Sequence, residues 1–279
     1  MHPSSVMVCF RAVNAIPTRS NARPAVAMLA IILALGVLWE LIKWVFALDN
    51  MTLPHLWTIA GAFAEESRRN GPPLGLFLLD AALFTFQGAL LGFTFGALLG
   101  FTLGTIFAHA PLLERGLVPF VVASQTVPIL AIAPMVVVWL GGSWLSVPVI
   151  AAYLTFFPVT INTLRGMRSP DPRALELMRS FAATKWETLW KLRFPAALPA
   201  IFTALKISAT SSVVGAVIAE LPAGVQKGLG GAILNFNMYY STGPERLWAS
   251  IVMAAAVGIV FFIIVAVAER LALRNILRN

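Results

Sequence analysis

The sequence has few charged residues. Only 11% of its 279 residues are Asp, Glu, Lys or Arg, while 59% are hydrophobic. A water-soluble domain needs far more charge to cover its surface. This scarcity excludes a soluble globular protein and leaves an integral membrane protein, in which each helix needs about 20 apolar residues to cross the hydrocarbon layer.

Cysteine, histidine and phosphate-binding glycine motifs are also scarce. The single cysteine, Cys9, excludes an internal disulfide. The three histidines, His2, His55 and His109, are too scattered along the chain to predict a metal site. The sequence contains no G-x-x-x-x-G-K-[ST] run. We therefore expect no catalytic residues, no metal and no cofactor bound by this chain, and ATP hydrolysis, if any, elsewhere.

Apolar runs locate six predicted spans. Two of them carry ionisable groups, Glu40 and Lys43 in the first and Lys206 in the fifth. The sequence therefore predicts an all-α membrane protein with a tail at residues 1–23, a transmembrane domain at 24–270 and a tail at 271–279. The six transmembrane helices are expected at about residues 24–48, 82–108, 117–140, 145–164, 199–220 and 247–269.

The basic residues are distributed unevenly between the two sides of these spans. Residues 165–198 alone hold seven Lys and Arg, and the tails hold more, whereas the loops on the other side hold only Arg68, Arg69, Lys227 and Arg246. Cytoplasmic loops carry an excess of Lys and Arg. We therefore expect both termini and residues 165–198 in the cytoplasm. Topology accounts for the net charge of +8, and no nucleic-acid partner is expected.

The second predicted span contains a near-repeat, GALLGFTF followed by GALLGFTL. It places five glycines four residues apart, on one face of a helix. Such a ridge lets another backbone approach closely, as in small-xxx-small membrane interfaces. The pattern predicts tight packing against another span, with a pore-lining role as the alternative. The glycines are Gly88, Gly92, Gly96, Gly100 and Gly104.

Prolines and small polar residues gather in the third to fifth predicted spans. Prolines free backbone carbonyls that neighbours or cavity water must satisfy, so clusters of them often mark broken helices around a path. The fifth span also has a small, weakly polar face. The candidates for the translocation path are Gln125, Thr126, Asn162, Lys206, Ser208, Ser211, Ser212 and Glu220.

Two of these candidates, Lys206 and Glu220, are ionisable. Charged groups inside a membrane are costly and are functional candidates by default. Fourteen residues separate the two, which is roughly 21 Å along a helix, so they cannot pair with each other. The alternatives are that Lys206 reaches the cytoplasmic interface and that Glu220 simply ends its helix outside the membrane.

The densest charge lies in residues 165–198, called the charged segment below. Asp171, followed by a proline, predicts a capped helix start. Thr184 and Glu187 match the capping box of a second helix, which Phe194-Pro195 is expected to end. The sequence thus predicts two short amphipathic helices joined at Ala182-Ala183. Such a pair either lies on anionic lipid headgroups or docks onto a cytoplasmic partner.

The charged segment resembles the signature of the membrane subunits of binding-protein-dependent ABC importers. That signature reads Glu-Ala-Ala, three residues, Gly, nine residues, Ile-x-Leu-Pro. Glu176 takes the Glu position and Pro195 the final proline, at the right separation. The positions that differ from the signature are Leu177, Met178, Ala182, Leu192 and Phe194.

Four longer stretches are similar to one branch of this family, which includes nitrate, sulfonate and taurine permeases and several vitamin and pyrimidine permeases. They are SQTVPILAIAPMVVVWLG (124–141), FFPVTINTLRGMRSPDPRALELMRS (156–180), FPAALPAIFTALKIS (194–208) and GAVIAE (215–220).

The resemblance implies a type I ABC importer permease fold in a bacterial inner membrane, with the charged segment as a cytoplasmic coupling loop. The implied partners are a cytoplasmic ABC ATPase homodimer that binds ATP-Mg, an extracytoplasmic solute-binding protein, a second copy of the chain and membrane lipid. The expected coupling residues are Glu176, Phe181, Ala182, Trp186 and Pro195. If the turn needs a positive φ, alanine at 182 costs about 1 kcal/mol relative to glycine.

The expected function is therefore that of a permease subunit for a small polar solute. The resemblance favours a heterocyclic vitamin, its precursor or a pyrimidine over nitrate, a sulfonate or taurine. One alternative is an autonomous secondary transporter or channel that uses Lys206 and Glu220. No second half repeats the first, although a homodimer could supply the symmetry. A scaffold subunit without a path is the other alternative.

Overall fold

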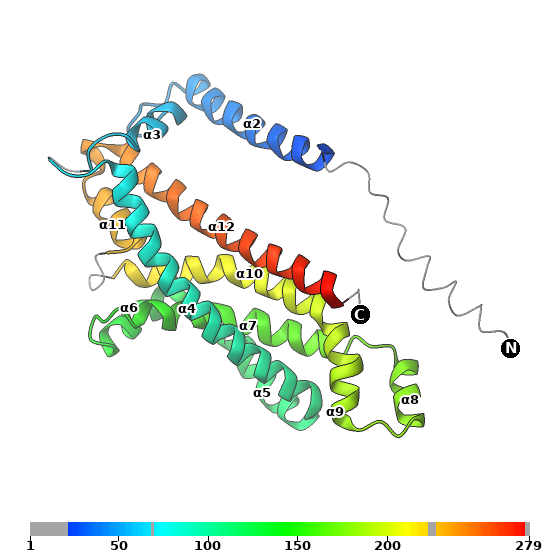
Figure 1. Ribbon diagram of the computed structural model, residues 1–279. Helices are drawn as coiled ribbons and strands as arrows, with labels where there is room; N and C mark the ends of the chain where they lie inside the picture. Colours follow the sequence, from blue (N-terminus) through cyan, green and yellow to red (C-terminus); the bar gives the residue numbers. More distant parts are fainter. Residues whose placement is uncertain (1–21, 68–69, 223–226, 277–279) are drawn as a thin grey trace. The chain divides into compact units, whose positions relative to one another are not determined.

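The computed structural model of the protein describes residues 22–67, 70–222 and 227–276 (Figure 1). The regular elements in these ranges are all helices. They are α2 (Ala22–Val45), α3 (Leu56–Ala62), α4 (Leu74–His109), α5 (Pro111–Ser124), α6 (Ile129–Trp139), α7 (Ser146–Met167), α8 (Pro172–Ser180), α9 (Lys185–Thr188), the π-helix η2 (Leu189–Arg193), α10 (Phe194–Glu220), α11 (Leu229–Met238), the 3-10 helix η3 (Tyr240–Thr242) and α12 (Pro244–Ile276). Of the two predicted tails, residues 1–21 and 277–279 lie outside the described residues.

The chain divides into two compact units after Trp57. The first unit contains α2, whose two ionisable groups are bonded to the loop that follows it. Lys43 Nζ donates to Asn50 Oδ1 at 2.6 Å, and the Glu40 carboxylate contacts His55 Nδ1 at 2.7 Å. These contacts explain how a predicted span carries two charges, because both lie at the end of the helix where the loop supplies polar partners.

Within the described residues, five helices are long and apolar enough to cross a membrane. They are α2, α4, α7, α12 and the continuous run Lys185–Glu220 that joins α9, η2 and α10. Most of them extend beyond the predicted spans. For example, α4 begins at Leu74 and not at residue 82, because the helix tolerates Asp80, the single charge that ended the apolar run.

The predicted third span, 117–140, is not one helix. It is the pair α5 and α6, which meet at an angle of 93°. Pro128 cannot donate a backbone hydrogen bond and disfavours helical geometry in the residue before it. The Ser124 and Thr126 hydroxyls donate to the carbonyls of Val121 and Ala123 at 2.7 and 2.8 Å, so side chains satisfy backbone acceptors at the break.

The five glycines of the near-repeat are buried and lie against α7. A Cβ built on Gly92 would lie 2.4 Å from the Cβ of Ala151, and one on Gly96 would lie 2.6 Å from the carbonyl oxygen of Ala152. One turn further along, Gly100 faces the carbonyl of Phe156 in the same way. The helix-packing interpretation of this pattern is therefore confirmed, since only glycine fits between the two backbones.

The direction of these contacts determines how the chain crosses between α4 and α7. The residue numbers of the contacts increase together along the two helices, from Gly92 of α4 opposite Ala151 of α7 to Gly104 opposite Thr163. The two helices therefore run in the same direction. The connection between them must return the chain to the starting side, and α5 and α6 make up that connection. Counted as one span, the bent pair brings the candidate spans in the described part of the chain to six.

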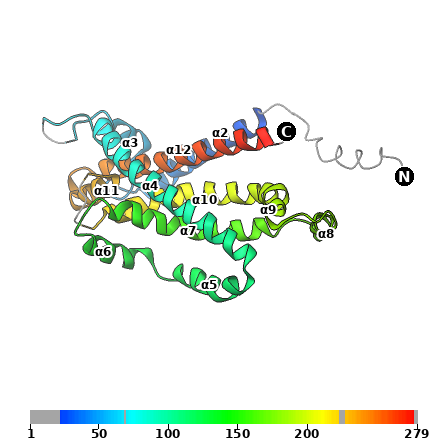
Figure 2. The ribbon, with the colours of Figure 1, turned by 60° about the horizontal axis from the view of Figure 1, so that its bottom comes forward.

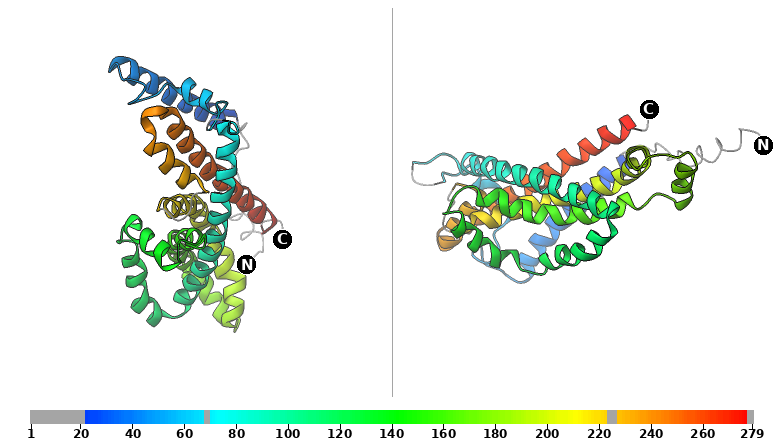
Figure 3. Two further views of the ribbon diagram at one scale, coloured as in Figure 1. Left: turned by 90° about the vertical axis from the view of Figure 1, so that its left-hand side faces the viewer. Right: turned by 90° about the horizontal axis from the view of Figure 1, so that it is seen from below.

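The second unit places the charged segment at one end and α11 at the other (Figures 2 and 3). In its centre α4, α7 and α10 pack against one another, and α12 packs against α10. The face of α10 toward α7 is formed by small residues. A Cβ on Gly215, for example, would lie 3.0 Å from the Cα of Ala151. The small face predicted for the fifth span is thus a packing face along most of its length.

The glycine contact predicts a position-specific effect of one methyl group. Gly96→Ala should lower the unfolding free energy by about 2 kcal/mol, because the new Cβ meets a backbone carbonyl that cannot move independently of its helix. Thermal unfolding in detergent, followed by tryptophan fluorescence, measures the loss. Gly258→Ala in α12 is the matched control, since no atom lies within 4 Å of its Cβ position. Equal melting temperatures for the two variants would contradict the packing argument.

Candidate coupling segment and polar residues of the spans

The first helix of the charged segment, α8, begins as the sequence predicts. Asp171 is its N-cap, and its side chain accepts a hydrogen bond from the backbone N–H of Arg173 at 2.8 Å. Pro172 occupies the first helical position, where its missing N–H costs nothing. No residue of α8 is fully buried. The helix is therefore set by local capping, and its side chains remain available on the surface.

The joint between the two short helices is a Schellman turn. The N–H of Ala183 donates to the carbonyl of Met178 at 3.0 Å, and the N–H of Ala182 donates to that of Arg179 at 2.9 Å. Ala182 occupies the left-handed position with φ of 52°. This turn normally contains glycine, because a Cβ is crowded in that conformation. The chain thus keeps the geometry of the turn with alanine in place of glycine.

The second helix begins with the predicted capping box. The N–H of Glu187 donates to Thr184 Oγ1 at 3.2 Å, and the Glu187 carboxylate accepts from the N–H of Thr184 at 2.9 Å. The prediction that Phe194-Pro195 ends this helix is wrong. A π turn, in which the N–H of Phe194 donates to Leu189 five residues back, accommodates the proline. The chain continues as helix into α10.

Several large apolar side chains of the charged segment are exposed. Phe181 is 76% exposed, Trp186 69% and Leu177 58%. Glu176 and Ala182 are exposed as well, whereas Pro195 is half-buried at the start of α10. Four of the five predicted coupling residues therefore lie on the surface, at the end of the second unit where α8 and α9 project (Figure 3).

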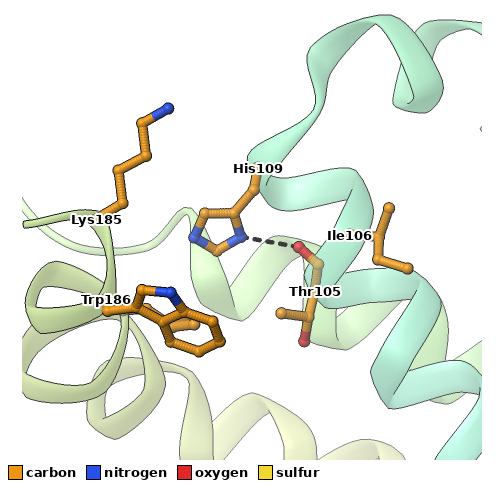
Figure 4. A pocket seen from close by; sticks show the side chains of 6 residues that line it. Thr105, Ile106, His109, Lys185 and Trp186 are labelled. Atoms are coloured by element: carbon orange, nitrogen blue, oxygen red, sulfur yellow. Dashed lines mark hydrogen bonds between the residues drawn. The ribbon is translucent and has the colours of Figure 1, made fainter.

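Trp186 also lines a pocket between α9 and the last turns of α4 (Figure 4). The pocket has a volume of about 250 Å³. His109 lies on the opposite side, where its Nδ1 donates to the carbonyl of Thr105 at 2.9 Å. The remaining lining residues are Ile106, Lys185 and Leu189. One face of Trp186 is thus turned toward α4, while much of its surface stays exposed.

The polar path candidates are distributed over several interfaces. Ser208 is buried, and its hydroxyl donates to the Thr155 carbonyl of α7 at 3.3 Å, while Ser212 is buried and bonds within α10. Asn162 is half-buried and donates to the Pro158 carbonyl at 2.8 Å. Ser211 is half-buried too. Among these four residues only Ser208 bonds across to the other helix, and the others bond to carbonyls of their own helices.

The break between α5 and α6 holds the other two neutral candidates. Gln125 is the C-cap of α5 and half-buried, and its Nε2 has no hydrogen-bond partner in the described part of the chain. Thr126 is exposed. An amide with an unused donor at a helix break can bind a polar molecule that reaches it.

Lys206 forms an ion pair with Glu269 of α12. The Nζ and Oε2 atoms are 2.7 Å apart, and both side chains are mostly buried. The pair joins α10 to α12 and neutralises both charges, which makes their position in a span tolerable. The sequence analysis predicted spans at 199–220 and 247–269 but did not predict that Lys206 of the first pairs with Glu269 of the second. A pair of opposite charges at the same end of two spans was the available signal.

Glu220 is buried and caps α11 from a distance. Its Oε2 accepts the N–H of Gly230 at 2.8 Å and the hydroxyl of Thr85 at 2.9 Å. Thr85 Oγ1 in turn accepts the N–H of Leu229 at 2.9 Å. The N-cap of α11 is Gly228, which has no side chain of its own to cap the helix. Glu220 and Thr85 therefore satisfy two N–H groups that the helix leaves free.

The structure also reveals an ion pair and a hydrogen bond of arginines that the sequence analysis missed. Arg168, which follows α7, binds the Glu114 carboxylate of α5 with both terminal nitrogens of its guanidinium. Arg193 of η2 donates to the carbonyl of Ala108, the second-last residue of α4, at 3.4 Å. No local pattern relates residues that are 54 and 85 positions apart.

The left-handed turn predicts a stabilising substitution. Ala182→Gly should stabilise the charged segment by about 1 kcal/mol, since glycine adopts positive φ without a clashing Cβ. Amide hydrogen exchange in residues 172–188 should then slow about fivefold. The control is Ala183→Gly, one residue further on, which has no positive φ. Faster exchange in the Ala182→Gly variant would show that the alanine conformation carries no strain.

The capping interaction of Glu220 predicts different effects for two substitutions. Glu220→Ala should lower the unfolding free energy by about 3 kcal/mol, because it leaves buried donors unpaired and opens a cavity. Glu220→Gln retains an acceptor oxygen and should cost less than about 1 kcal/mol. Thermal unfolding measures both. If the Gln variant lost as much as the Ala variant, the negative charge and not the capping geometry would be the essential property.

Comparison with known proteins supports the architecture described above. The family model of the binding-protein-dependent transport system inner membrane component matches residues 92–274. The chain is 32% identical over 251 residues to the riboflavin transport system permease protein RibX of Chloroflexus aurantiacus, covering 90% of each. It is 40% identical over 118 residues to the formylaminopyrimidine transport permease protein ThiX of Halalkalibacterium halodurans, covering 42% of this chain and 47% of that protein.

Two further comparisons extend over most of the chain. The putative aliphatic sulfonates transport permease protein SsuC of Bacillus subtilis is 30% identical over 234 residues, covering 82% of this chain and 79% of that protein. Among solved structures, a chain of the MetNI methionine ABC transporter in inward-facing conformations has a TM-score of 0.60 at 17% identity, covering 74% of this chain and 98% of that one. This similarity shows the type I importer permease fold. The chain belongs to the family of binding-protein-dependent transport system inner membrane components.

Proposed function

We propose that this protein is the permease subunit of an ATP-driven importer of a small polar solute. It would work in a bacterial inner membrane as a homodimer, with an ABC ATPase homodimer at the charged segment and a solute-binding protein on the opposite side. In this arrangement both termini and the charged segment are cytoplasmic, and ATP-Mg binds to the ATPase. The observation that carries the proposal is the exposed apolar surface at the joint of the charged segment.

The exposed surface has the chemistry of a docking site. Phe181, Leu177 and Trp186 are large apolar side chains that lie within ten residues of one another and remain exposed. A cluster of this kind on a surface that also carries charge marks an interaction site, and aromatic residues dominate binding energies. The coupling surface proposed here consists of Glu176, Phe181, Ala182 and Trp186, and Pro195 positions it through the π turn at its base.

The capped turns favour protein docking over adsorption to lipid headgroups. Both helix starts and the joint between α8 and α9 are hydrogen-bonded within the segment itself. The segment therefore needs neither a lipid surface nor a partner to define its shape. A surface that is ordered before binding loses less conformational entropy on association, which suits a site that transmits movement from an ATPase.

For the translocation path we propose the residues that the packing leaves partly accessible. Gln125 and Thr126 lie at the break between α5 and α6, and Asn162 and Ser211 are half-buried. Broken helices border the paths of many transporters. Ser208 and Ser212 are buried at helix contacts, which favours a structural role for them.

The ionisable candidates do not favour an autonomous secondary transporter. Lys206 is paired with Glu269, and Glu220 caps α11, so each has a structural role within the described part of the chain. Ion-coupled transport needs a group that gains and loses its ion during the cycle. Glu220→Gln tests this directly, because the variant should stay folded and keep ATP-dependent transport.

The names of the relatives are the basis for the solute class that we propose for this protein. The printed names of two of them refer to riboflavin and to a formylaminopyrimidine, and others refer to sulfonates and taurine. We propose a heterocyclic vitamin, its precursor or a pyrimidine as the solute class, with a sulfonate, taurine or nitrate as the alternative. Binding of riboflavin, a formylaminopyrimidine and taurine to the purified solute-binding protein would discriminate between these classes.

The docking proposal predicts the loss of ATPase binding when one aromatic side chain is removed. Phe181→Ala should weaken association with the ATPase about 30-fold, as expected for an interface hot spot. Co-purification with the ATPase and titration in detergent measure the affinity. Phe95→Ala in α4 is the matched control, since Phe95 is also exposed, at 65%, but lies in a span. Unchanged ATPase affinity in the Phe181→Ala variant would refute this coupling surface.

A further inference from the structure

Both ends of the charged segment bind the same corner of the fold. This corner, residues 107–114, comprises the last three residues of α4, Ala110 and the first turn of α5. At the entry to the segment, Arg168 Nη1 donates to Glu114 Oε1 at 2.6 Å, and its Nη2 donates to the second carboxylate oxygen. At the exit, Arg193 Nη1 donates to the carbonyl of Ala108 at 3.4 Å. Two arginines 25 residues apart thus hold one corner from two sides.

The Glu114–Arg168 pair suits both helices that carry it. Glu114 lies in the first turn of α5, and Arg168 is the C-cap of α7. Carboxylates are favoured at helix N-termini and cations at C-termini. A bidentate pair also fixes the relative orientation of its two groups, because the planar guanidinium matches the carboxylate at two points. The contact therefore determines both distance and angle between α5 and the start of the charged segment.

The rest of α5 is held loosely by comparison. It has no fully buried side chain. Val118 and Val121 are partly buried against the apolar cluster formed by α4, α7 and α10. Its far end is bound to α7 by the Tyr153 hydroxyl, which donates to the carbonyl of Ser124. Directly after that bond the chain bends by 93° into α6. Polar contacts at its two ends thus define much of the position of α5.

We propose that Glu114 and Arg168 are positioning residues that transmit movement of the charged segment to α5 and so to the bent α5–α6 span. This inference rests on the proposed function, in which an ATPase docks onto the charged segment. A displacement of the segment moves Arg168 and Arg193 together, and both pull on the corner at residues 107–114. The bend next to Gln125 and Thr126 then changes its angle or exposure.

The pair is partly exposed, at 20% for Glu114 and 43% for Arg168. Exposed ion pairs contribute little to folding stability, so single neutral substitutions should leave the protein folded. A role in transmission predicts a different result, namely a folded and ATPase-bound complex whose bent span no longer responds to nucleotide. This difference makes the inference testable.

The experiment follows the bent span directly. A Thr126→Cys reporter is placed at the break, with Cys9→Ser removing the natural thiol, and a maleimide probe measures its accessibility in the assembled complex with and without ATP and vanadate. In the otherwise unchanged complex the labelling rate should change about fivefold or more with nucleotide. With Glu114→Gln or Arg168→Gln the ratio should fall below about twofold, while ATP hydrolysis continues.

Two variants serve as controls. Lys191→Gln removes a basic charge and an exposed ion pair with Glu187 from the same segment, and it should leave the labelling response intact. The double variant Glu114→Arg with Arg168→Glu restores an ion pair but places each charge at the unfavourable end of its helix, so it should recover about half of the response. A full response in either single variant, or a double variant no better than the singles, would overturn the inference.

A measurement on the permease alone separates this inference from the proposed function. Arg168→Gln should speed amide hydrogen exchange in residues 111–124 about fivefold, because α5 loses the contact at its first turn. Unchanged exchange there would refute the positioning contact, whatever the partner is. Failure of the unchanged permease to bind an ATPase, together with faster exchange in the variant, would refute the proposed function and leave the contact established.

Discussion

The close contact between α4 and α7 determines the arrangement of the second unit. Gly92, Gly96 and Gly100 let the two backbones approach so closely that any Cβ would meet a carbonyl or side chain of α7. Because the two helices run in the same direction, α5 and α6 must return the chain across the bundle outside this contact. The helix α10 packs against both α7 and α4, and its small residues allow a second close approach to α7. The first helix of the bent pair, α5, has no fully buried side chain and is packed less tightly than α4 and α7.

Buried charges connect the remaining helices to this central pair. Lys206 binds Glu269 and so joins α10 to α12, while Glu220 and Thr85 join α10 and α4 to the start of α11. A lipid environment offers these groups no alternative partner, so each contact also fixes how far the helices are shifted along their axes. The two contacts lie near the middle of α10, at Lys206, and at its last residue, Glu220, so α10 is held to its neighbours at two positions along its axis.

The sequence predicted the features that depend on local patterns. The apolar runs, the glycine spacing, the Asp171 cap and the Thr184 capping box are all present in the structure. The predicted helix end at Pro195 was wrong, because a π turn can absorb a proline without ending the helix. The partners of Lys206 and Glu220 could not be derived, because Glu269 and Thr85 are distant in sequence and no helical period relates them. The prolines of the third predicted span indicated a broken helix, but the angle between α5 and α6 depends on how they pack on the other helices and could not be predicted.

The rigidity of the joint in the charged segment complements the looseness of α5. The Schellman turn at Ala182 and the capping box at Thr184 satisfy the backbone at both sides of the joint, so α8 and α9 keep their relative orientation when the segment is displaced. Near its two ends the segment binds the corner before α5, through Arg168 and Arg193. Both bind the corner that leads into α5, so the transmission proposed above reaches the bent pair through this corner. The glycine contact leaves no space between α4 and α7, whereas α5 has no fully buried side chain, which makes the bent pair the part of this bundle that we propose to respond.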